Sequence, residues 1–303
     1  MAVTASMVKE LRQKTGVGMM DCKKALGETD GNMDAAVDWL RKKGMASAQK
    51  KSARVAAEGM VTTLSTGTAA VMVEVNSETD FTAKNEGFIG FASTVTKLAA
   101  ESGSTDIDQL KAVAFPETGR NVGEELTNLI ATIGENMNLR RLQRMEVSSG
   151  LVSSYVHAGG KIGVLVGLES DATADALQEL GKKLAMHVAA AAPQFLDRDS
   201  VDGAAMEREK AVLVEQAKAS GKPDNIIEKM VMGRMSKYYG DVCMLEQAFV
   251  MDPDMKVSKV VEAAAKELGS AVKVTGFARF QLGEGIEKKE EDFAAEVAKQ
   301  VQG

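Results

Sequence analysis

The sequence has few of the residues that interrupt or cross-link a chain. Only four of its 303 residues are proline, two are cysteine and 4% are aromatic. So few prolines favour regular helices and strands joined by few irregular segments. Cys22 and Cys243 lie far apart and form no CxxC pair, which is typical of a protein in a reducing compartment.

Long apolar runs are also absent. No stretch approaches the roughly 18 consecutive apolar residues that a membrane-spanning helix needs. The N-terminus has no basic segment followed by an apolar one, the pattern of a secretory signal. We therefore expect a cytoplasmic protein with no membrane partner.

The common motifs of catalytic and cofactor sites are missing as well. There is no GxxxxGK[ST] phosphate loop, and the glycine pairs in residues 16–21 and 283–288 lack the third glycine of a dinucleotide motif. We expect both pairs to end helices. His157 and His187 fall in different predicted elements without zinc spacing, and we expect His187 to be packed within a helix. The sequence thus predicts no enzyme, no cofactor and no metal.

Charge is unevenly distributed along the chain. The net charge is −6, yet residues 1–54 hold 11 basic and 6 acidic side chains. The acidic remainder argues against a general nucleic-acid binder, because neutralising phosphates requires a basic face. The basic N-terminus suits an acidic patch on a partner protein. A solvated helical surface explains the same charges, and charge alone favours that explanation.

Residues 1–54 have the pattern of a small helical bundle. Apolar spacing predicts short helices at residues 4–14, 19–26 and 33–40, with Gly44 ending the third. A basic linker helix is predicted at residues 46–54. Three short helices of this kind resemble compact binding modules.

The middle of the chain contains the same pattern twice: a hairpin, a polar corner and a long helix. The first copy has strands at residues 60–65 and 70–76, and the second at 151–157 and 162–168. Setting residues 79–83 against 170–174 places a hydroxyl and an aspartate at both corners, as helix N-caps require. Only the first corner continues with a ring, Phe81.

This comparison leads us to interpret Phe81 as an exposed probe for another protein, with Thr79 and Asp80 as helix caps. The alternative is that Phe81 covers the core, because it precedes Phe88 by seven residues and so falls on the same helical stripe. Spacing and composition by themselves favour the alternative. The comparison of the two corners favours the probe.

The remaining elements follow from the same periodicities. Helices are predicted at residues 106–114 and 121–132, then a strand at 138–147 and a long helix ending before Pro193. Helices at 201–220 and 224–239 form a hairpin that can pair with a second copy through one apolar stripe. A helix at 257–268, a strand at 271–282 and an amphipathic tail at 286–301 complete the chain. The stripe comprises Ile227, Met230, Val231, Met235 and Tyr238.

These elements predict an α+β fold, since helices and antiparallel hairpins are mixed along the chain. The predicted domains are an N-terminal bundle with its linker (1–54), a core N-subdomain (55–147), a core C-subdomain (148–192 with 240–283), an inserted helical hairpin (193–239) and a C-terminal module (284–303).

Several long motifs resemble the bacterial translation elongation factor Ts family. They lie at residues 11–26, 74–81, 133–136, 185–190, 275–280 and 292–297, so the similarity runs from end to end. Members of that family are guanine-nucleotide exchange factors for the GTPase elongation factor Tu. The resemblance implies a ubiquitin-associated-like N-terminal bundle, a two-part α+β core, a dimerisation hairpin and a C-terminal module.

The resemblance also implies roles for individual residues. Asp80 and Phe81 match a pair that intrudes beside the magnesium site of the GTPase. Glu78 and Thr82 differ from the residues common at those positions, but the ring and the acid are kept. The other matching partner contacts are Arg12, Met19 and Met20 in the bundle, Lys51 in the linker, and Ile133, Gly134 and His157 in the core.

The sequence therefore predicts an exchange factor that binds elongation factor Tu and promotes GDP release. Two other functions remain as alternatives. A ribosome- or nascent-chain-associated protein would act through the N-terminal bundle and would not need Phe81. A thiol enzyme would use Cys22, whose pKa the neighbouring Lys23 and Lys24 can lower.

Overall fold

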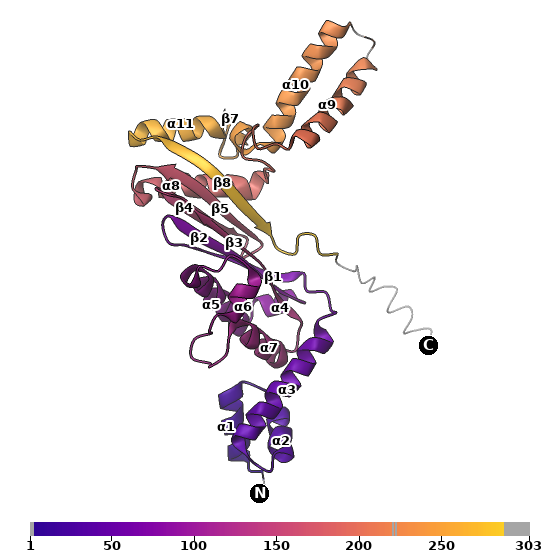
Figure 1. Ribbon diagram of the computed structural model, residues 1–303, viewed down its shortest axis with the longest axis vertical. Helices are drawn as coiled ribbons and strands as arrows, with labels where there is room; N and C mark the ends of the chain where they lie inside the picture. The colour runs from indigo at the N-terminus through magenta and orange to yellow at the C-terminus, as the bar shows by residue number, and fades with distance from the viewer. Residues whose placement is uncertain (1–2, 220, 222, 288–303) are drawn as a thin grey trace. The chain divides into compact units, whose positions relative to one another are not determined.

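The computed structural model describes residues 3–219, 221 and 223–287 and contains both helices and strands, as the α+β prediction requires (Figure 1). The described chain divides into two compact units. The first takes residues up to 60, 73–141 and those from 281 onward, and the second takes 61–72 and 142–280.

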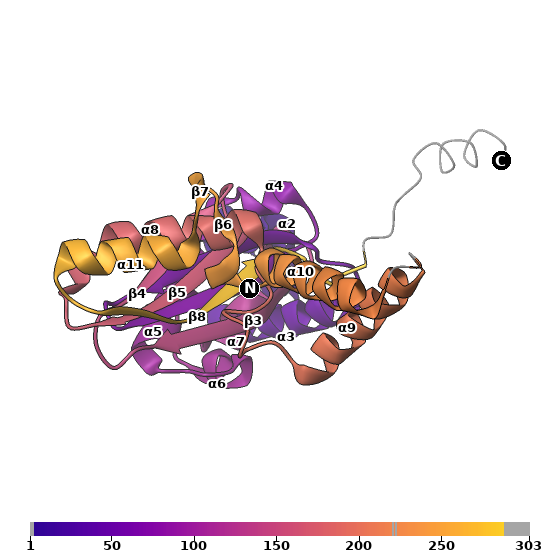
Figure 2. The ribbon, with the colours of Figure 1, turned by 90° about the horizontal axis from the view of Figure 1, so that it is seen from above.

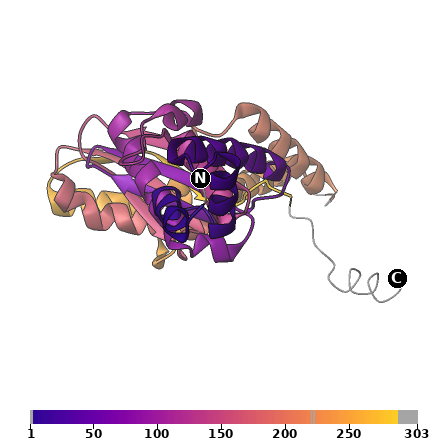
Figure 3. The ribbon, with the colours of Figure 1, turned by 90° about the horizontal axis from the view of Figure 1, so that it is seen from below.

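The first unit begins with three helices that pack together (Figure 3). Helix α1 ends where Gly16 adopts a left-handed conformation with φ 72°, as predicted. The helices are α1 (Ala5–Thr15), α2 (Met19–Glu28) and α3 (Met33–Lys51). Their common core comprises Leu11, Cys22, Ala25, Leu26, Ala36 and Leu40.

Helix α3 corrects the prediction that Gly44 ends the third helix. The helix runs through Gly44 to Lys51, so the predicted linker helix is its second half. Gly44 faces helix α7 (Val122–Ile133), and a Cβ at this position would lie 3.2 Å from Cβ of Ala131. The glycine allows two helices to approach closely and does not end α3.

The rest of the first unit packs helices α5, α6 and α7 around apolar side chains. Phe88, Phe91 and Val95 of α5 are buried, and the Phe91 ring stacks on Phe115 with centroids 5.8 Å apart. Strands β1, β2 and β3 form one sheet in that order, and β1 and β2 continue into the second unit. The elements are β1 (Glu58–Ser65), β2 (Ala69–Ser77), α4 (Asp80–Ala83), α5 (Glu86–Ser102), α6 (Ile107–Ala112) and β3 (Met137–Glu146).

The second unit is built on a sheet of order β4-β5-β8 with helices α8 and α11 on one face (Figure 2). Strands β4 and β5 form the predicted antiparallel hairpin, with Leu151 opposite Leu168 and His157 opposite Ile162. The short strands β6 and β7 were not predicted. The elements are β4 (Leu151–His157), β5 (Ile162–Ser170), α8 (Ala174–Ala191), the 3-10 helix η1 (Met244–Glu246), β6 (Ala248–Phe249), β7 (Asp252–Lys256), α11 (Val257–Leu268) and β8 (Val272–Gln281).

The predicted helical hairpin is present as α9 (Gly203–Lys218) and α10 (Asp224–Val242), which lie side by side (Figure 1). Much of the apolar stripe on α10 faces α9. Ile227 and Val231 are buried against Leu213 and Ala217. The stripe therefore stabilises the hairpin itself, and pairing with a second copy stays a prediction. The predicted tail helix at 286–301 lies almost entirely outside the described residues.

Candidate functional site

Phe81 lies on a separate turn of helix between β2 and α5. This turn is α4, and its N-cap residue Thr79 accepts a hydrogen bond from the backbone N–H of Thr82 over 3.4 Å. The Thr82 side chain points inward and is 5% exposed, whereas Phe81 is 79% exposed. The ring is therefore solvent-facing, as the probe interpretation expects, and the alternative that it covers the core is wrong. Because α4 is not part of α5, the seven-residue spacing to Phe88 does not place the two rings on one helical face.

Asp80 has a different role from the cap that the sequence predicts. It is the first residue of α4, and its Oδ2 lies 2.7 Å from Nζ of Lys84. The same Nζ lies 5.7 Å from the centroid of the Phe81 ring. Lys84 thus contacts both residues of the predicted intruding pair. A lysine ammonium at this distance is attracted to the ring face.

The caps also correct the comparison of the two corners. Helix α5 is capped by Asn85, which accepts from the N–H groups of Gly87 and Phe88. Helix α8 is capped by Thr173, and not by Ser170 or Asp171. Asn85 and Thr173 are therefore the equivalent residues, and the first corner contains an additional helical turn. That additional turn carries Phe81.

A second turn lies beside α4, at the end of α7. Gly134 has φ 92°, a left-handed conformation that glycine adopts without strain, and its N–H donates to the carbonyl of Ile130 over 3.0 Å. The next residue, Glu135, accepts from both the backbone N–H and the hydroxyl of Thr79. The structure therefore brings the predicted residues Ile133 and Gly134 next to the turn that carries Phe81.

The predicted residues of the bundle lie on its surface. Met19 and Met20 begin α2 and are 57% and 77% exposed, so neither side chain belongs to the core of the bundle. Arg12 is exposed on α1. Lys51 ends α3 and is half-buried, with its Nζ donating to Oγ of Ser47 over 2.6 Å.

His157 belongs to the second unit. It ends strand β4 with an exposed side chain, and its Nδ1 lies 2.9 Å from the hydroxyl of Tyr155. The histidine is therefore accessible to a partner and has one ring nitrogen already engaged within its own unit.

Cys22 does not have the environment of a reactive thiol. The side chain is fully buried in the bundle core, and its Sγ–H donates to the carbonyl of Val17 over 3.4 Å. Burial raises the pKa of this thiol, and the hydrogen bond with Thr15 offsets only part of the increase. The alternative of a lowered pKa is therefore ruled out, because Lys23 and Lys24 are exposed and the thiol faces the core.

His187 is the packed helical histidine that the sequence predicts. It is fully buried in α8, with Nε2 2.9 Å from Oε1 of Gln247 and Nδ1 accepting from the N–H of Val250. Burial lowers its pKa, while the hydrogen bond with Gln247 acts in the opposite direction. These contacts hold the β6–β7 hairpin against α8.

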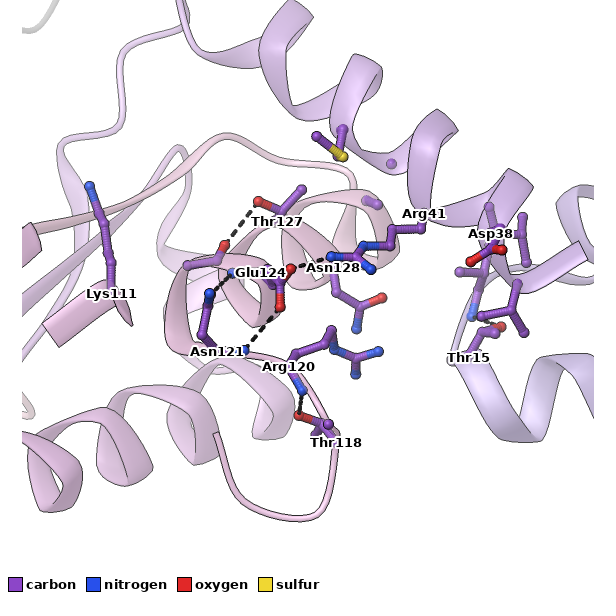
Figure 4. A pocket seen from close by; sticks show the side chains of 18 of the residues that line it. Thr15, Asp38, Arg41, Lys111, Thr118, Arg120, Asn121, Glu124, Thr127 and Asn128 are labelled. Atoms are coloured by element: carbon purple, nitrogen blue, oxygen red, sulfur yellow. Dashed lines mark hydrogen bonds and ion pairs between the residues drawn. The ribbon is translucent and has the colours of Figure 1, made fainter. Parts of the chain in front are cut away.

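A cavity of about 630 Å³ lies between α3 and α7 (Figure 4). Arg41 of α3 reaches across to form an ion pair with Glu124 of α7, and Arg120 pairs with Glu125 over 2.5 Å. None of the predicted contact residues lines this cavity. Among the described residues, no group of three or more His, Cys, Asp or Glu side chains is placed to hold a metal ion. No described helix combines the length and apolarity that crossing a membrane requires.

Sequence reasoning missed four residues that hold the Phe81 turn: Arg54, Glu78, Glu135 and Asn136. Glu78 accepts from the backbone N–H of Asn136 over 2.5 Å, and the Asn136 side chain donates to the carbonyl of Arg54 over 2.7 Å. Glu135 and Asn136 belong to the motif at residues 133–136, and this motif is the sequence feature that points to them. Their partners are distant in sequence, so the motif alone did not reveal these contacts.

The fold and this site define an α+β protein that presents an aromatic ring and two methionines on its surface, a composition suited to binding another protein. Comparison with known proteins identifies the family. The sequence model described as Elongation factor TS matches residues 78–284. Elongation factor Ts of Magnetococcus marinus is 82% identical over 303 residues and covers 100% of both chains. The proteins of the same name from Paramagnetospirillum magneticum and Rhodospirillum centenum are 60% and 58% identical, each over 98% of this chain and over 97% and 98% of their own.

The chain therefore belongs to the elongation factor Ts family. It is a translation elongation factor and not an enzyme.

Proposed function

We propose that this protein is a guanine-nucleotide exchange factor that binds elongation factor Tu in the cytoplasm and promotes GDP release. The observation that carries the proposal is the solvent-facing ring of Phe81 on a turn whose opposite side is anchored by buried Thr82. A ring presented in this way can enter a neighbouring protein without unfolding its own unit.

The mechanism requires no covalent change. A GTPase holds GDP through the amides of its phosphate loop, a lysine and a bound Mg²⁺. A protein that binds the nucleotide-free form more tightly than the loaded form must weaken nucleotide binding by the same factor. Phe81 would supply this difference by filling space that exists only when the Mg²⁺ region is rearranged.

The other proposed contacts would add affinity around this ring. Asp80, Ile133 and Gly134 adjoin Phe81 in the first unit, and His157 offers a contact from the second. Arg12, Met19, Met20 and Lys51 would anchor the complex without distinguishing its nucleotide states. The thioethers of Met19 and Met20 suit a groove because they adapt their shape.

We also propose the family organisation for the chain: a ubiquitin-associated-like bundle, a two-part core, an inserted hairpin and a C-terminal module. The hairpin is a candidate homodimer interface. Its support is the set of apolar side chains that α9 and α10 leave exposed, namely Val212, Ile226 and Met232. We expect no direct contact with nucleic acid, because the chain outside residues 1–54 is acidic.

The direct test is the release of a fluorescent GDP analogue from the cognate elongation factor Tu, with and without this protein. We expect the rate of GDP release to rise as more of this protein is added to the loaded GTPase. A helper that acts on ribosomes through the bundle would sediment with ribosomes and leave GDP release unchanged. That second result would contradict the proposal.

A further inference from the structure

Two turns of the first unit are joined by a pair of carboxylates. The segment before α4 and the segment after α7 lie 56 residues apart in the chain. Glu135 of the second segment binds Thr79 of the first, and Glu78 of the first binds the backbone of Asn136 in the second. The two carboxylates act in opposite directions, because Glu135 accepts hydrogen bonds from the first segment and Glu78 accepts one from the second.

Glu135 uses both of its carboxylate oxygens on Thr79. Its Oε2 accepts from the backbone N–H over 3.0 Å, and its Oε1 accepts from the hydroxyl over 2.7 Å. The same hydroxyl oxygen accepts from the N–H of Thr82 as the N-cap of α4. Because its proton is directed to Glu135, the hydroxyl presents its lone pairs to the helix. Glu135 therefore orients the cap on which α4 depends.

Helix α4 needs this support because it is only four residues long. An isolated helix of this length is unstable, since nucleation fixes several residues for a single hydrogen bond. Its side chains offer little packing, because only Thr82 is buried, Asp80 and Ala83 are half-buried, and Phe81 is exposed. The position of the ring must therefore come from the ends of the turn.

The second carboxylate connects the same turns to the end of the bundle. Oε1 of Glu78 lies 2.5 Å from the N–H of Asn136 and 3.5 Å from Nη1 of Arg54. The Asn136 side chain donates back to the carbonyl of Arg54. Three segments thus meet in one cluster, with Glu78 at its centre.

We infer that Glu135 is a positioning residue that holds the Phe81 ring ready for the partner, acting through Thr79 and the cap of α4. The inference rests on the proposed function. Preorganising a contact residue lowers the entropy lost on binding, so the affinity gained from the ring depends on how firmly α4 is held. Glu135 itself need not touch the GTPase.

A double-mutant cycle tests this role through GDP release. We expect Glu135→Ala to slow the stimulated release about tenfold in the wild-type background, the scale of lost hydrogen bonds to a charged group. In a Phe81→Ala background the same change should cost less than about twofold, because the residue through which it acts is gone. Glu135→Gln, which retains one carbonyl acceptor, should lose less than Glu135→Ala. The matched control is Glu101→Ala, which removes an exposed carboxylate that forms an ion pair with Lys97 on the same helix, α5.

Equal losses in both backgrounds would overturn the inference, because Glu135 would then act independently of Phe81. A wild-type rate in Glu135→Ala would overturn it as well. Failure of the wild-type protein to accelerate release would instead contradict the proposed function. Amide hydrogen exchange on the free protein keeps the two questions separate. We expect faster exchange at Thr79 and Thr82 in Glu135→Ala than in Glu101→Ala, and unchanged exchange would refute the positioning role without any partner present.

Discussion

At the scale of the residue, adjacent positions 81 and 82 have opposite environments. Thr82 is buried, although it carries a hydroxyl, and Phe81 is exposed, although burying a phenylalanine side chain is worth about 1.5–3 kcal/mol. The folded chain therefore leaves apolar binding energy unused at this turn. That energy is available to a partner that can enclose the ring.

Replacing Phe81 should separate stability from function. We expect Phe81→Ala to change the free energy of unfolding by less than about 0.5 kcal/mol, as for most surface substitutions. The stimulated GDP release should slow by about tenfold or more, because the ring's burial in the partner is lost. Thermal unfolding and fluorescent GDP release measure the two effects.

The matched comparison is Phe88→Ala, which removes a fully buried ring from α5. That change should cost about 3–5 kcal/mol of stability through the cavity it leaves. If Phe81→Ala destabilised the protein as much as Phe88→Ala, the ring would be part of the core and not a contact residue.

At the scale of the element, glycines inside helices serve different purposes that only their neighbours reveal. Gly44 and Gly181 lie where another element approaches closely, at Ala131 for the first and Ser153 for the second. Gly90 in the middle of α5 has open space around it. Sequence gives all three the same low helix propensity. The neighbours show that Gly44 and Gly181 allow their helices to pack closely against another element, whereas Gly90 does not.

We expect Gly181→Ala to destabilise the second unit by about 1–3 kcal/mol, the usual cost of overpacking. Its new Cβ would lie 2.6 Å from Cβ of Ser153 on β4, so α8 must move away from the sheet. Urea-induced unfolding followed by circular dichroism measures the change.

Gly90→Ala is the control for this prediction. It adds the same methyl group to a helix without a neighbour in reach, and should leave stability unchanged or raise it by up to about 1 kcal/mol. A similar loss in both variants would show that helix propensity, and not the approach of α8 to β4, determines the effect.

At the scale of the whole chain, a buried carboxylate connects segments that are far apart in sequence. Glu74 of β2 is fully buried and accepts from Arg140 over 2.9 Å, Arg141 over 2.5 Å and the N–H of Gly283 over 2.9 Å. Gly283 follows strand β8 with φ 70°. The prediction that this glycine ends a helix is therefore wrong. Glu74 therefore fixes the point from which the chain continues beyond β8.

The pKa of Glu74 predicts a pH dependence of stability. Burial alone would raise this pKa, but the hydrogen bonds from Gly283, Arg140, Arg141 and Asn76 outweigh burial and hold it below the ordinary value of 4.5. A depressed carboxylate pKa contributes stability above the unfolded-state pKa, and this contribution is lost as pH falls through the folded-state pKa.

We therefore expect Glu74→Gln to cost about 2 kcal/mol at pH 7, the scale of lost hydrogen bonds to a charged group. The difference between the wild-type protein and this variant should shrink as pH falls below about 4.5. Denaturant unfolding at several pH values between 7 and 3 measures it. A difference that stays constant across this range would mean that the Glu74 charge does not stabilise the fold.

Local patterns predicted most of the elements well. The period-two run in residues 162–168 is strand β5, and the spacing in residues 257–268 is helix α11 with the same bounds. Gly16 ends a helix as predicted, because a left-handed residue is a local requirement, and Gly134 ends α7 in the same conformation. The corners were predicted less well, since several residues near Thr79 and Ser170 are suitable caps and spacing cannot choose among them.

The candidate site was predicted in part. Phe81 was expected to face solvent and does so, and Met19 and Met20, which were expected as partner contacts, are exposed as well. The roles of all three in binding stay predictions. The alternative of a reactive thiol at Cys22 is excluded, because the buried side chain faces away from the exposed lysines that would lower its pKa. The cluster of Arg54, Glu78, Glu135 and Asn136 was not predicted at all.

The sequence by itself determined the α+β character, the periodic elements and the long motifs that mark the family, because each depends on residues within a few positions of one another. The tertiary structure alone decided which side chains are buried and which distant groups meet. Gly44 beside Ala131, Glu135 on Thr79 and Glu74 with Gly283 are all pairings across many residues. Such pairings form only when the folded chain brings the segments together, and no local pattern encodes their partners.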